Sequence, residues 1–244
     1  MATRTFAERF EVARTRFGPL VFGLDPSASV LASWGLDDDA GGLERFADIT
    51  LEATVGAVGM VKPQAAFFER HGWRGMKVLD RLVRSARSSG LLVILDAKRG
   101  DVGSTNDAYA CAYLGEGAAM QVDALTLSPY LGVEAMGAFF DAALAAGSAL
   151  FVVARSSNLE GRALQEAILS RPAAAGSAGE VSPVGAAGPA PAVGGLTVEQ
   201  SVLASIAARN QQVAPGGVGP FGAVIGATHQ AAGELDLVRM GGLL

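Results

Sequence analysis

Cysteine and histidine are scarce in this sequence: its 244 residues include one cysteine and two histidines. A single cysteine excludes an internal disulfide and is typical of a reducing cytoplasm, the location we expect. Cys111 lies in the helical pattern A-Y-A-C-A-Y-L, which predicts a small buried side chain rather than a nucleophile. No cluster of transition-metal ligands is visible, so the residues indicate no metal site.

A surplus of positive charge and long apolar runs are also missing. Lys and Arg number 19 against 24 Asp and Glu, and the net charge of −5 argues against a nucleic-acid-binding surface. Gly, polar or charged residues interrupt every apolar run before it reaches transmembrane length. Residues 1–18 form an amphipathic helical pattern and lack the apolar centre of a signal peptide. We therefore expect neither nucleic acid nor membrane as a partner.

The sequence does contain a repeated alternation of short apolar runs and helical patterns, as expected of βα units. Hydrophobic residues make up 50% of the chain, enough for a sizeable core. Six apolar runs predict strands at residues 20–24, 59–61, 91–95, 124–127, 149–154 and 221–226. Helices are expected at residues 43–58, from about 76 to a cap at Gly90, from 104, at 133–146, 160–170 and 197–213, and after His229.

The predicted fold class is α/β of the (β/α)8 TIM-barrel type, with six βα units readable. No G-x-G-x-x-G or Walker pattern follows the first strand, as an open doubly wound sheet would normally show. We expect a single domain over residues 1–244, with a flexible Ala/Gly/Pro-rich insertion at 172–195. Capping boxes should begin two helices, formed by Ser104 with Asp107 and by Thr197 with Gln200.

The stretch from residue 91 to residue 107, L-L-V-I-L-D-A-K-R-G-D-V-G-S-T-N-D, carries the strongest indication of chemistry. Asp96, Lys98 and Asp101 follow a strand predicted to be buried on both faces, where charges cost free energy unless they pair or do chemistry. Alternation along a strand puts Asp96 and Lys98 on the same side. There the carboxylate would keep the lysine protonated and fixed in direction, as a proton donor requires. A surface salt-bridge cluster in a loop is the alternative interpretation.

Other predicted strands also end in polar motifs, G-L-D-P at residues 23–26, V-K-P-Q at 61–64 and T-L-S-P at 126–129, and D-A-K-R-G-D-V-G-S-T lies at 96–105. This set resembles the orotidine 5′-monophosphate decarboxylase family. The motif at 96–105 is similar to that family's D-x-K-x-x-D signature, which related sugar-phosphate barrel enzymes share, and the other three motifs support the resemblance in the same order. F-F-E-R, A-R-S-S-N-L-E-G and V-I-G-A-T resemble its actinobacterial-like branch. The resemblance covers residues 18–165 and 196–230.

The resemblance implies catalytic roles for the charged residues, in the decarboxylation of orotidine 5′-monophosphate to uridine 5′-monophosphate. Lys98 would protonate pyrimidine C6 as carbon dioxide leaves, and Asp96 would lie beside the substrate carboxylate, whose charge it repels. Lys62 would orient Asp96 and touch the ribose. Asp101 would be a further catalytic residue, donated into the site of a neighbouring subunit.

Binding roles follow from the same resemblance. Asp25 would accept a hydrogen bond from a ribose hydroxyl, and Ser128 would bind the pyrimidine ring. Thr105, like Asp101, would reach into the partner's site, which implies a homodimer. The family uses neither a metal nor an organic cofactor, so fixed charges would supply the transition-state complementarity.

Two further pieces of the family pattern have no counterpart in this sequence. Members carry a P-G-x-G-A-Q-G-like loop on strand seven and an arginine near strand eight, and both grip the 5′-phosphate. We therefore expect a barrel lacking its last two strands, and two alternatives stay open. The chain could be a non-catalytic or crippled truncated barrel, or a sugar-phosphate barrel enzyme that uses Mg²⁺ on an enediolate.

Overall fold

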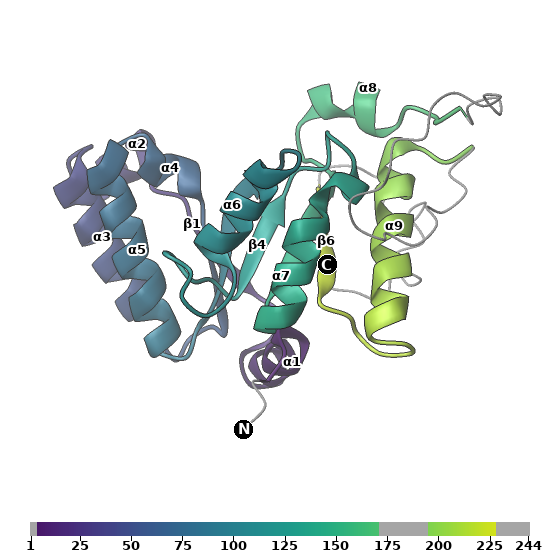
Figure 1. Ribbon diagram of the computed structural model, residues 1–244. Helices are drawn as coiled ribbons and strands as arrows, with labels where there is room; N and C mark the ends of the chain where they lie inside the picture. The colour runs from purple at the N-terminus through teal and green to yellow at the C-terminus, as the bar shows by residue number, and fades with distance from the viewer. Residues whose placement is uncertain (1–3, 171–194, 228–244) are drawn as a thin grey trace.

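The computed structural model describes residues 4–170 and 195–227 (Figure 1). The helix expected after His229 and all but the last residue of the expected insertion at 172–195 lie outside the described residues. The described strands form one six-stranded parallel sheet in the order β1-β2-β3-β4-β5-β6. They are β1 (Val21–Leu24), β2 (Met60–Pro63), β3 (Leu92–Arg99), β4 (Ala124–Leu127), β5 (Ala149–Arg155) and β6 (Phe221–Ile225). All six predicted strands are present, but the third was predicted too short: β3 runs four residues past the predicted end at Leu95, so Asp96 and Lys98 lie within the strand and not after it.

Helices connect the strands as the predicted βα units require. They are α1 (Phe6–Phe17), α2 (Ala28–Ser33), α3 (Ala40–Thr54), α4 (Ala65–Glu69), α5 (Gly72–Ser88), α6 (Ser104–Tyr113), η1 (Val133–Met136), α7 (Gly137–Ala146), η2 (Leu159–Gly161), α8 (Arg162–Gln165) and α9 (Val198–Val213). In the part of the chain that the structure describes, none of them is long and apolar enough to cross a membrane.

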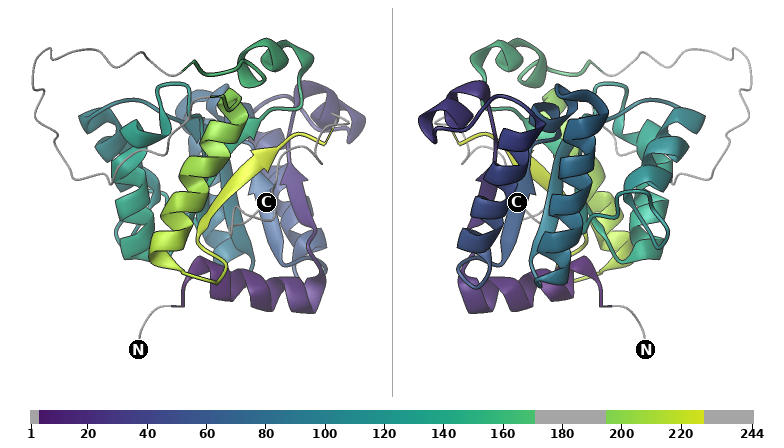
Figure 2. Two further views of the ribbon diagram at one scale, coloured as in Figure 1. Left: turned by 90° about the vertical axis from the view of Figure 1, so that its right-hand side faces the viewer. Right: turned by 90° about the vertical axis from the view of Figure 1, so that its left-hand side faces the viewer.

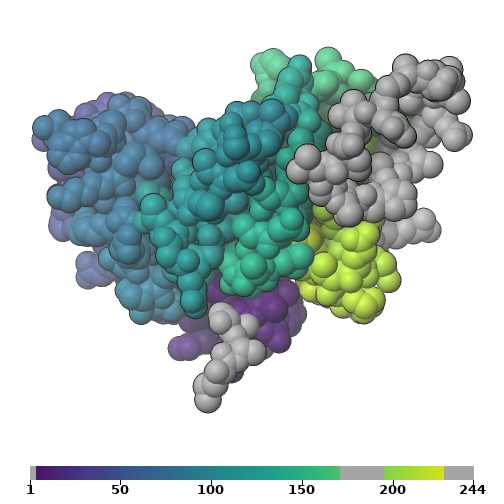
Figure 3. Space-filling view, viewed as in Figure 1, coloured from purple at the N-terminus to yellow at the C-terminus, as the bar shows by residue number. Residues whose placement is uncertain are grey.

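Two hydrophobic clusters lie on the two faces of the sheet. The larger one fills the space between the strands and the covering helices, with Leu79 of α5, Phe139 of α7 and Ile206 of α9 fully buried. The smaller one lies on the other face, where Phe6 of α1 packs with Met60 and further inward-facing strand residues. Helix α1 lies across the base of the sheet (Figures 2 and 3), so the lower part of the interior is closed by apolar side chains.

A buried carboxylate fixes α1 to this base. Asp123, which precedes β4, is 2% exposed, and its carboxylate accepts a hydrogen bond from the Val93 N–H at 3.0 Å. The same carboxylate pairs with Arg9 of α1 and, at 3.3 Å, with Arg87 of α5. Arg9 also donates to the Gly147 carbonyl oxygen at 3.3 Å, so this one side chain joins α1 to the segments that precede β4 and β5.

Three local predictions are wrong. The Ser104 side chain makes no cap, because Gly103, at φ 53°, occupies the N-cap position and α6 begins at Ser104 itself. The helix predicted over 160–170 ends at Gln165, because the following residues pair with the segment before α9. Cys111 is exposed, since its helix turns the neighbouring Ala110 inward instead.

The second capping box is confirmed. Thr197 accepts a hydrogen bond from the Gln200 N–H at 3.3 Å, and the Gln200 side chain accepts one from the Thr197 N–H at 2.9 Å. Helix α9 is therefore set at its N-terminus by local sequence alone. Its position against the sheet is set by a buried pair between Arg155 of β5 and Glu199.

Candidate active site

Three charged side chains meet at the carboxyl ends of β2 and β3. Lys62 Nζ lies 2.9 Å from Asp96 Oδ2, and Lys98 Nζ lies 2.6 Å from Asp96 Oδ1. The Asp96 side chain is 10% exposed, whereas those of Lys62 and Lys98 are 34% and 45% exposed. The carboxylate is thus held inside the barrel between two ammonium groups that face the open end. The prediction that Asp96 and Lys98 share one side of the strand is confirmed by this contact.

Two neutral side chains complete the contacts of Asp96. Thr126 of β4, which is 2% exposed, donates its hydroxyl to Asp96 Oδ1 at 2.9 Å. With its amide assigned so that the nitrogen faces Asp96, Gln64 donates to Asp96 Oδ2 at 3.2 Å and to the Asp96 carbonyl oxygen at 2.5 Å. Both carboxylate oxygens therefore accept one charged and one neutral hydrogen bond, which leaves Asp96 little freedom to rotate.

The backbone at Lys98 is strained. Among the described residues it is the one non-glycine residue with a positive φ, 45°. The register between β3 and β4 shifts between Leu95 and Arg99, so Lys98 lies in a bulge of the sheet. Such a conformation costs about 1–3 kcal/mol and persists where surrounding contacts over-determine it. Here the Lys98 N–H donates to Thr126 Oγ1 at 2.9 Å.

The charges around Asp96 set its protonation state. Burial raises the pKa of Asp96, but the hydrogen bonds from Lys98 and Lys62 outweigh burial and hold the pKa below its usual value. The carboxyl is therefore ionised near neutral pH. An ionised carboxylate repels any second carboxylate brought beside it, and an adjacent ammonium can deliver a proton.

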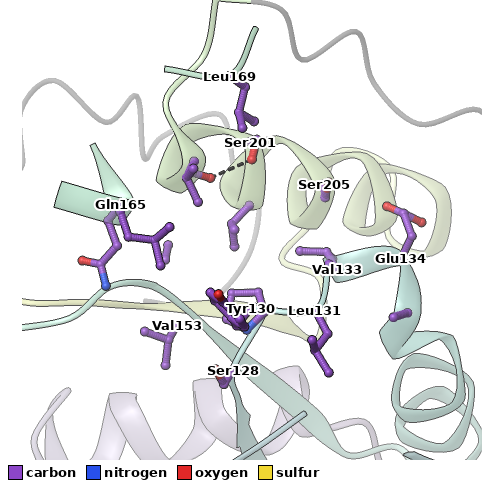
Figure 4. Close-up of a pocket in the computed structure, with 17 residues that line it drawn as sticks. Ser128, Tyr130, Leu131, Val133, Glu134, Val153, Gln165, Leu169, Ser201 and Ser205 are labelled. Atoms are coloured by element: carbon purple, nitrogen blue, oxygen red, sulfur yellow. Dashed lines mark hydrogen bonds between the residues drawn. The ribbon is translucent and has the colours of Figure 1, made fainter. Parts of the chain in front are cut away.

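The candidate substrate-binding residues lie at neighbouring strand ends. Asp25 directly follows β1, and its side chain is exposed. Gly23 of β1 pairs with Lys62 of β2, and Asp25 lies two residues beyond Gly23 on the same face of the sheet. Ser128 follows β4 and is half-buried, and its N–H donates to the Arg99 carbonyl oxygen at 2.8 Å. It borders a cavity of about 590 Å³ between the loop after β4 and α9 (Figure 4).

Asp101 and Thr105 do not contact the charged array, formed by Lys62, Asp96 and Lys98, in the described part of the chain. The Asp101 carboxylate accepts a hydrogen bond from the Val102 N–H at 2.8 Å, and no ion pair links it to Lys62 or Lys98 among the residues described. Thr105 is exposed on the first turn of α6.

Two residues that fix the loop after β3 escaped the sequence analysis. Asn106 is fully buried; its amide accepts from the Asp101 N–H at 2.8 Å and donates to the carbonyl oxygens of Asp101 and Ala135 at 2.5 and 2.8 Å. At Gly100 a Cβ would lie 2.3 Å from the Ser128 carbonyl oxygen, so only glycine fits this close approach of the two loops. A buried asparagine in a polar motif has no sequence pattern that would reveal these contacts.

Arg99 and Glu69 join two motifs that the sequence places 30 residues apart. Arg99 of β3 forms an ion pair with Glu69 of the F-F-E-R segment, and its guanidinium lies over the rings of Tyr109 and Tyr113. Burial lowers the pKa of Arg99, but hydrogen bonds to Tyr113 and Glu69 more than compensate and raise it. This arginine therefore anchors the end of β3 against α4 and α6.

No group of three or more His, Cys, Asp or Glu side chains within residues 4–170 and 195–227 is placed to hold a metal ion.

Comparison with known sequences supplies the decisive observation. The sequence model of the orotidine 5′-phosphate decarboxylase / HUMPS family matches residues 18–240. This chain belongs to that family. It is 45% identical over 240 residues to an orotidine 5′-phosphate decarboxylase of Salinispora arenicola, and 44% identical over 239 residues to one of Streptomyces coelicolor. Both alignments cover 98% of this chain and 77% of the relative.

The fold comparison agrees with the family assignment. A solved structure from Streptomyces avermitilis that carries the same family assignment superposes with a TM-score of 0.86 at 42% identity. The alignment covers 100% of this chain and 76% of that one. The predicted barrel-type fold and the predicted resemblance are both confirmed.

Proposed function

We propose that this chain decarboxylates orotidine 5′-monophosphate to uridine 5′-monophosphate, with Lys98 as the proton donor to C6. The observation that carries the proposal is the Lys62–Asp96–Lys98 array, held at the carboxyl ends of β2 and β3 in a chain of this family. Ligand sites of α/β barrels lie at this end of the strands.

In the proposed reaction the bond between C6 and the carboxylate carbon breaks, carbon dioxide leaves, and the electron pair stays on C6. The Lys98 ammonium then gives C6 a proton and is reprotonated from solvent. Asp96, ionised and wedged between two lysines, lies beside the departing carboxylate, and their repulsion is relieved as carbon dioxide leaves. Fixed charges of this kind stabilise a developing carbanion without reorganising during the reaction.

The other candidate residues are assigned binding roles in the same scheme. Lys62 orients Asp96 and contacts the ribose. Asp25 accepts a hydrogen bond from a ribose hydroxyl, and Ser128 binds the pyrimidine ring. The positions that support these roles are the shared face of Asp25 and Lys62 at the strand ends and the place of Ser128 beside the end of β3, where its N–H donates to the Arg99 carbonyl oxygen at 2.8 Å.

A homodimer in the cytoplasm is part of the proposal. Asp101 and Thr105 would act in the partner's site. What supports this is that the Asp101 carboxylate makes no ion pair with Lys62 or Lys98 among the described residues, and that Thr105 is exposed on α6. One domain would span residues 1–244, and the single cysteine fits a reducing compartment.

The test measures turnover as the loss of orotidylate absorbance. Two proteins are compared: this chain, and the same chain extended by a segment that supplies strands seven and eight of the family. Both are assayed with and without a chelator, and the product formed in D₂O is examined for deuterium at C6. Turnover that a chelator leaves unchanged, with one deuterium at C6, supports the proposal. Turnover only in the extended form supports the site and shows that it needs the added phosphate contacts. No turnover in either form would refute it, and turnover of a sugar phosphate that requires Mg²⁺ would favour the related barrel enzymes.

A further inference from the structure

Thr126 has a contact pattern that its place in an apolar strand does not require. It is the polar member of the buried strand A-L-T-L, and its hydroxyl reaches across to β3. Thr126 Oγ1 lies 2.9 Å from Asp96 Oδ1 and 2.9 Å from the Lys98 backbone nitrogen. One hydroxyl thus contacts the side chain of one residue of the array and the main chain of another.

The direction of both hydrogen bonds is fixed by chemistry. The Lys98 N–H can only donate, so the Thr126 oxygen accepts from it. An ionised carboxylate can only accept, so the single hydroxyl proton points to Asp96 Oδ1. The Thr126 hydroxyl must therefore accept from Lys98 and donate to Asp96 at the same time. This fixes the position of β4 relative to Asp96 and the Lys98 backbone.

The hydrogen bonds of Thr126 form a closed ring with Asp96 and Lys98, the proposed proton donor. Asp96 Oδ1, which accepts from Thr126, is also the oxygen that lies 2.6 Å from Lys98 Nζ. Thr126 therefore ties the carboxylate that aims the ammonium to the strained backbone that carries it, where φ is 45°. Without this tie, both the bulge and the carboxylate lose a partner that is buried away from water.

We propose that Thr126 is a positioning residue that holds Asp96 and the Lys98 backbone in the geometry for proton transfer. The proposal rests on the proposed function in that Lys98 is the proton donor. It gives Thr126 no contact with substrate.

The test compares Thr126→Val, which keeps the shape of the side chain and removes the hydroxyl, with Thr126→Ser, which keeps the hydroxyl. Thr126→Val should lower kcat by about 10- to 100-fold, the range for losing one hydrogen bond to a charged group. KM and the dissociation constant for uridine 5′-monophosphate should stay within about 3-fold of the parent protein, because remote binding contacts are unchanged. Thr126→Ser should recover kcat to within about 3-fold, since its hydroxyl can make both contacts.

A second readout needs no turnover. The Asp96 carboxyl, which faces Lys62 from β2 and Lys98 from β3, is titrated by carbon NMR in the parent and both variants. Its apparent pKa should rise in Thr126→Val and return in Thr126→Ser, because a hydrogen bond to the charged form is lost and restored. If Thr126→Val does not fold, Thr126→Ala makes the same comparison.

The outcomes separate this proposal from the proposed function. Three results would overturn the positioning role of Thr126. They are equal losses of kcat in Thr126→Val and Thr126→Ser, full kcat in Thr126→Val, and an Asp96 pKa that is the same in all three proteins. If orotidylate is not turned over by any form but the Asp96 titration shifts as expected, the proposed function fails and the role of Thr126 in fixing the array stands.

Discussion

Asp123 offers a test that separates the stability of this barrel from its chemistry. Its side chain is 3% exposed, and its carboxylate holds the base of the sheet together through Arg9, Arg87 and the Val93 N–H. The charged array lies at the other end of the strands, where β2 and β3 finish. A change at Asp123 should therefore lower the free energy of unfolding without altering turnover.

The magnitude follows from the three contacts. Asp123→Asn keeps an oxygen for the Val93 N–H and loses the charge that pairs with two arginines. Since the Arg9 and Arg87 side chains are 28% and 30% exposed and can return to water, we expect a loss of about 2 kcal/mol. Asp123→Ala also leaves the Val93 N–H buried without an acceptor, which raises the expected loss to about 3–5 kcal/mol.

Urea and thermal unfolding measure this prediction. The melting temperature should fall by about 4–8 °C in Asp123→Asn and about 6–20 °C in Asp123→Ala. The matched control is Asp48→Asn, which breaks an exposed pair with Arg81 at 2.9 Å, side chains 51% and 47% exposed, and should cost less than about 1 kcal/mol. A change below about 2 °C in Asp123→Ala, or a fall in kcat/KM of the folded variant at 25 °C, would refute the reasoning.

Three further predictions concern the array and the insertion. Lys62→Met should lower kcat/KM by about 100-fold or more, since Asp96 Oδ2 loses its 2.9 Å partner, and a loss below about 3-fold in steady-state assays would contradict this. Because the pKa of Asp96 lies below its usual value of 3.8, its ionised form stabilises the fold above that pH and stops doing so as pH falls through the lower pKa. The stability gap between the parent and Asp96→Asn, measured by urea unfolding from pH 6 to pH 3, should therefore narrow on acidification; a gap that widens is inconsistent with the pairing. Replacing residues 172–193 by a short Gly-Ser linker should leave kcat and the melting temperature unchanged. The reason is that the Gly195 N–H donates to the Leu169 carbonyl oxygen at 3.1 Å, which holds the flanking ends together. A large loss of kcat or of melting temperature would show that the segment has a role.

The six strands and the contact between Asp96 and Lys98 could be predicted because local rules decide them. Short apolar runs mark the strands, and alternation along a strand is enough to put Asp96 and Lys98 on one side. The capping box at Thr197 formed as predicted because only two residues, Thr197 and Gln200, three positions apart, take part in it.

The contacts that hold the site in place depend on tertiary structure and were not predictable in the same way. Thr126 and Gln64 are neutral residues in apolar or Pro-containing segments, and they matter only because β2, β3 and β4 are adjacent. Arg9 and Asp123 are 114 residues apart, and no pattern in either segment points to the other. Ser104 failed as a cap because the positive φ of Gly103 moved the helix start by one residue, which composition alone does not show.

The central claim is that Lys98 delivers the proton to C6, and turnover of orotidylate by Lys98→Ala tests it most directly. The Lys98→Ala protein should lose at least about 10³-fold in kcat, while uridine 5′-monophosphate still binds within about 10-fold of the parent affinity. Lys98 is 45% exposed, so its removal should not prevent folding, and an unchanged melting curve would establish that. Decarboxylation by folded Lys98→Ala at a rate within about 10-fold of the parent would contradict the account.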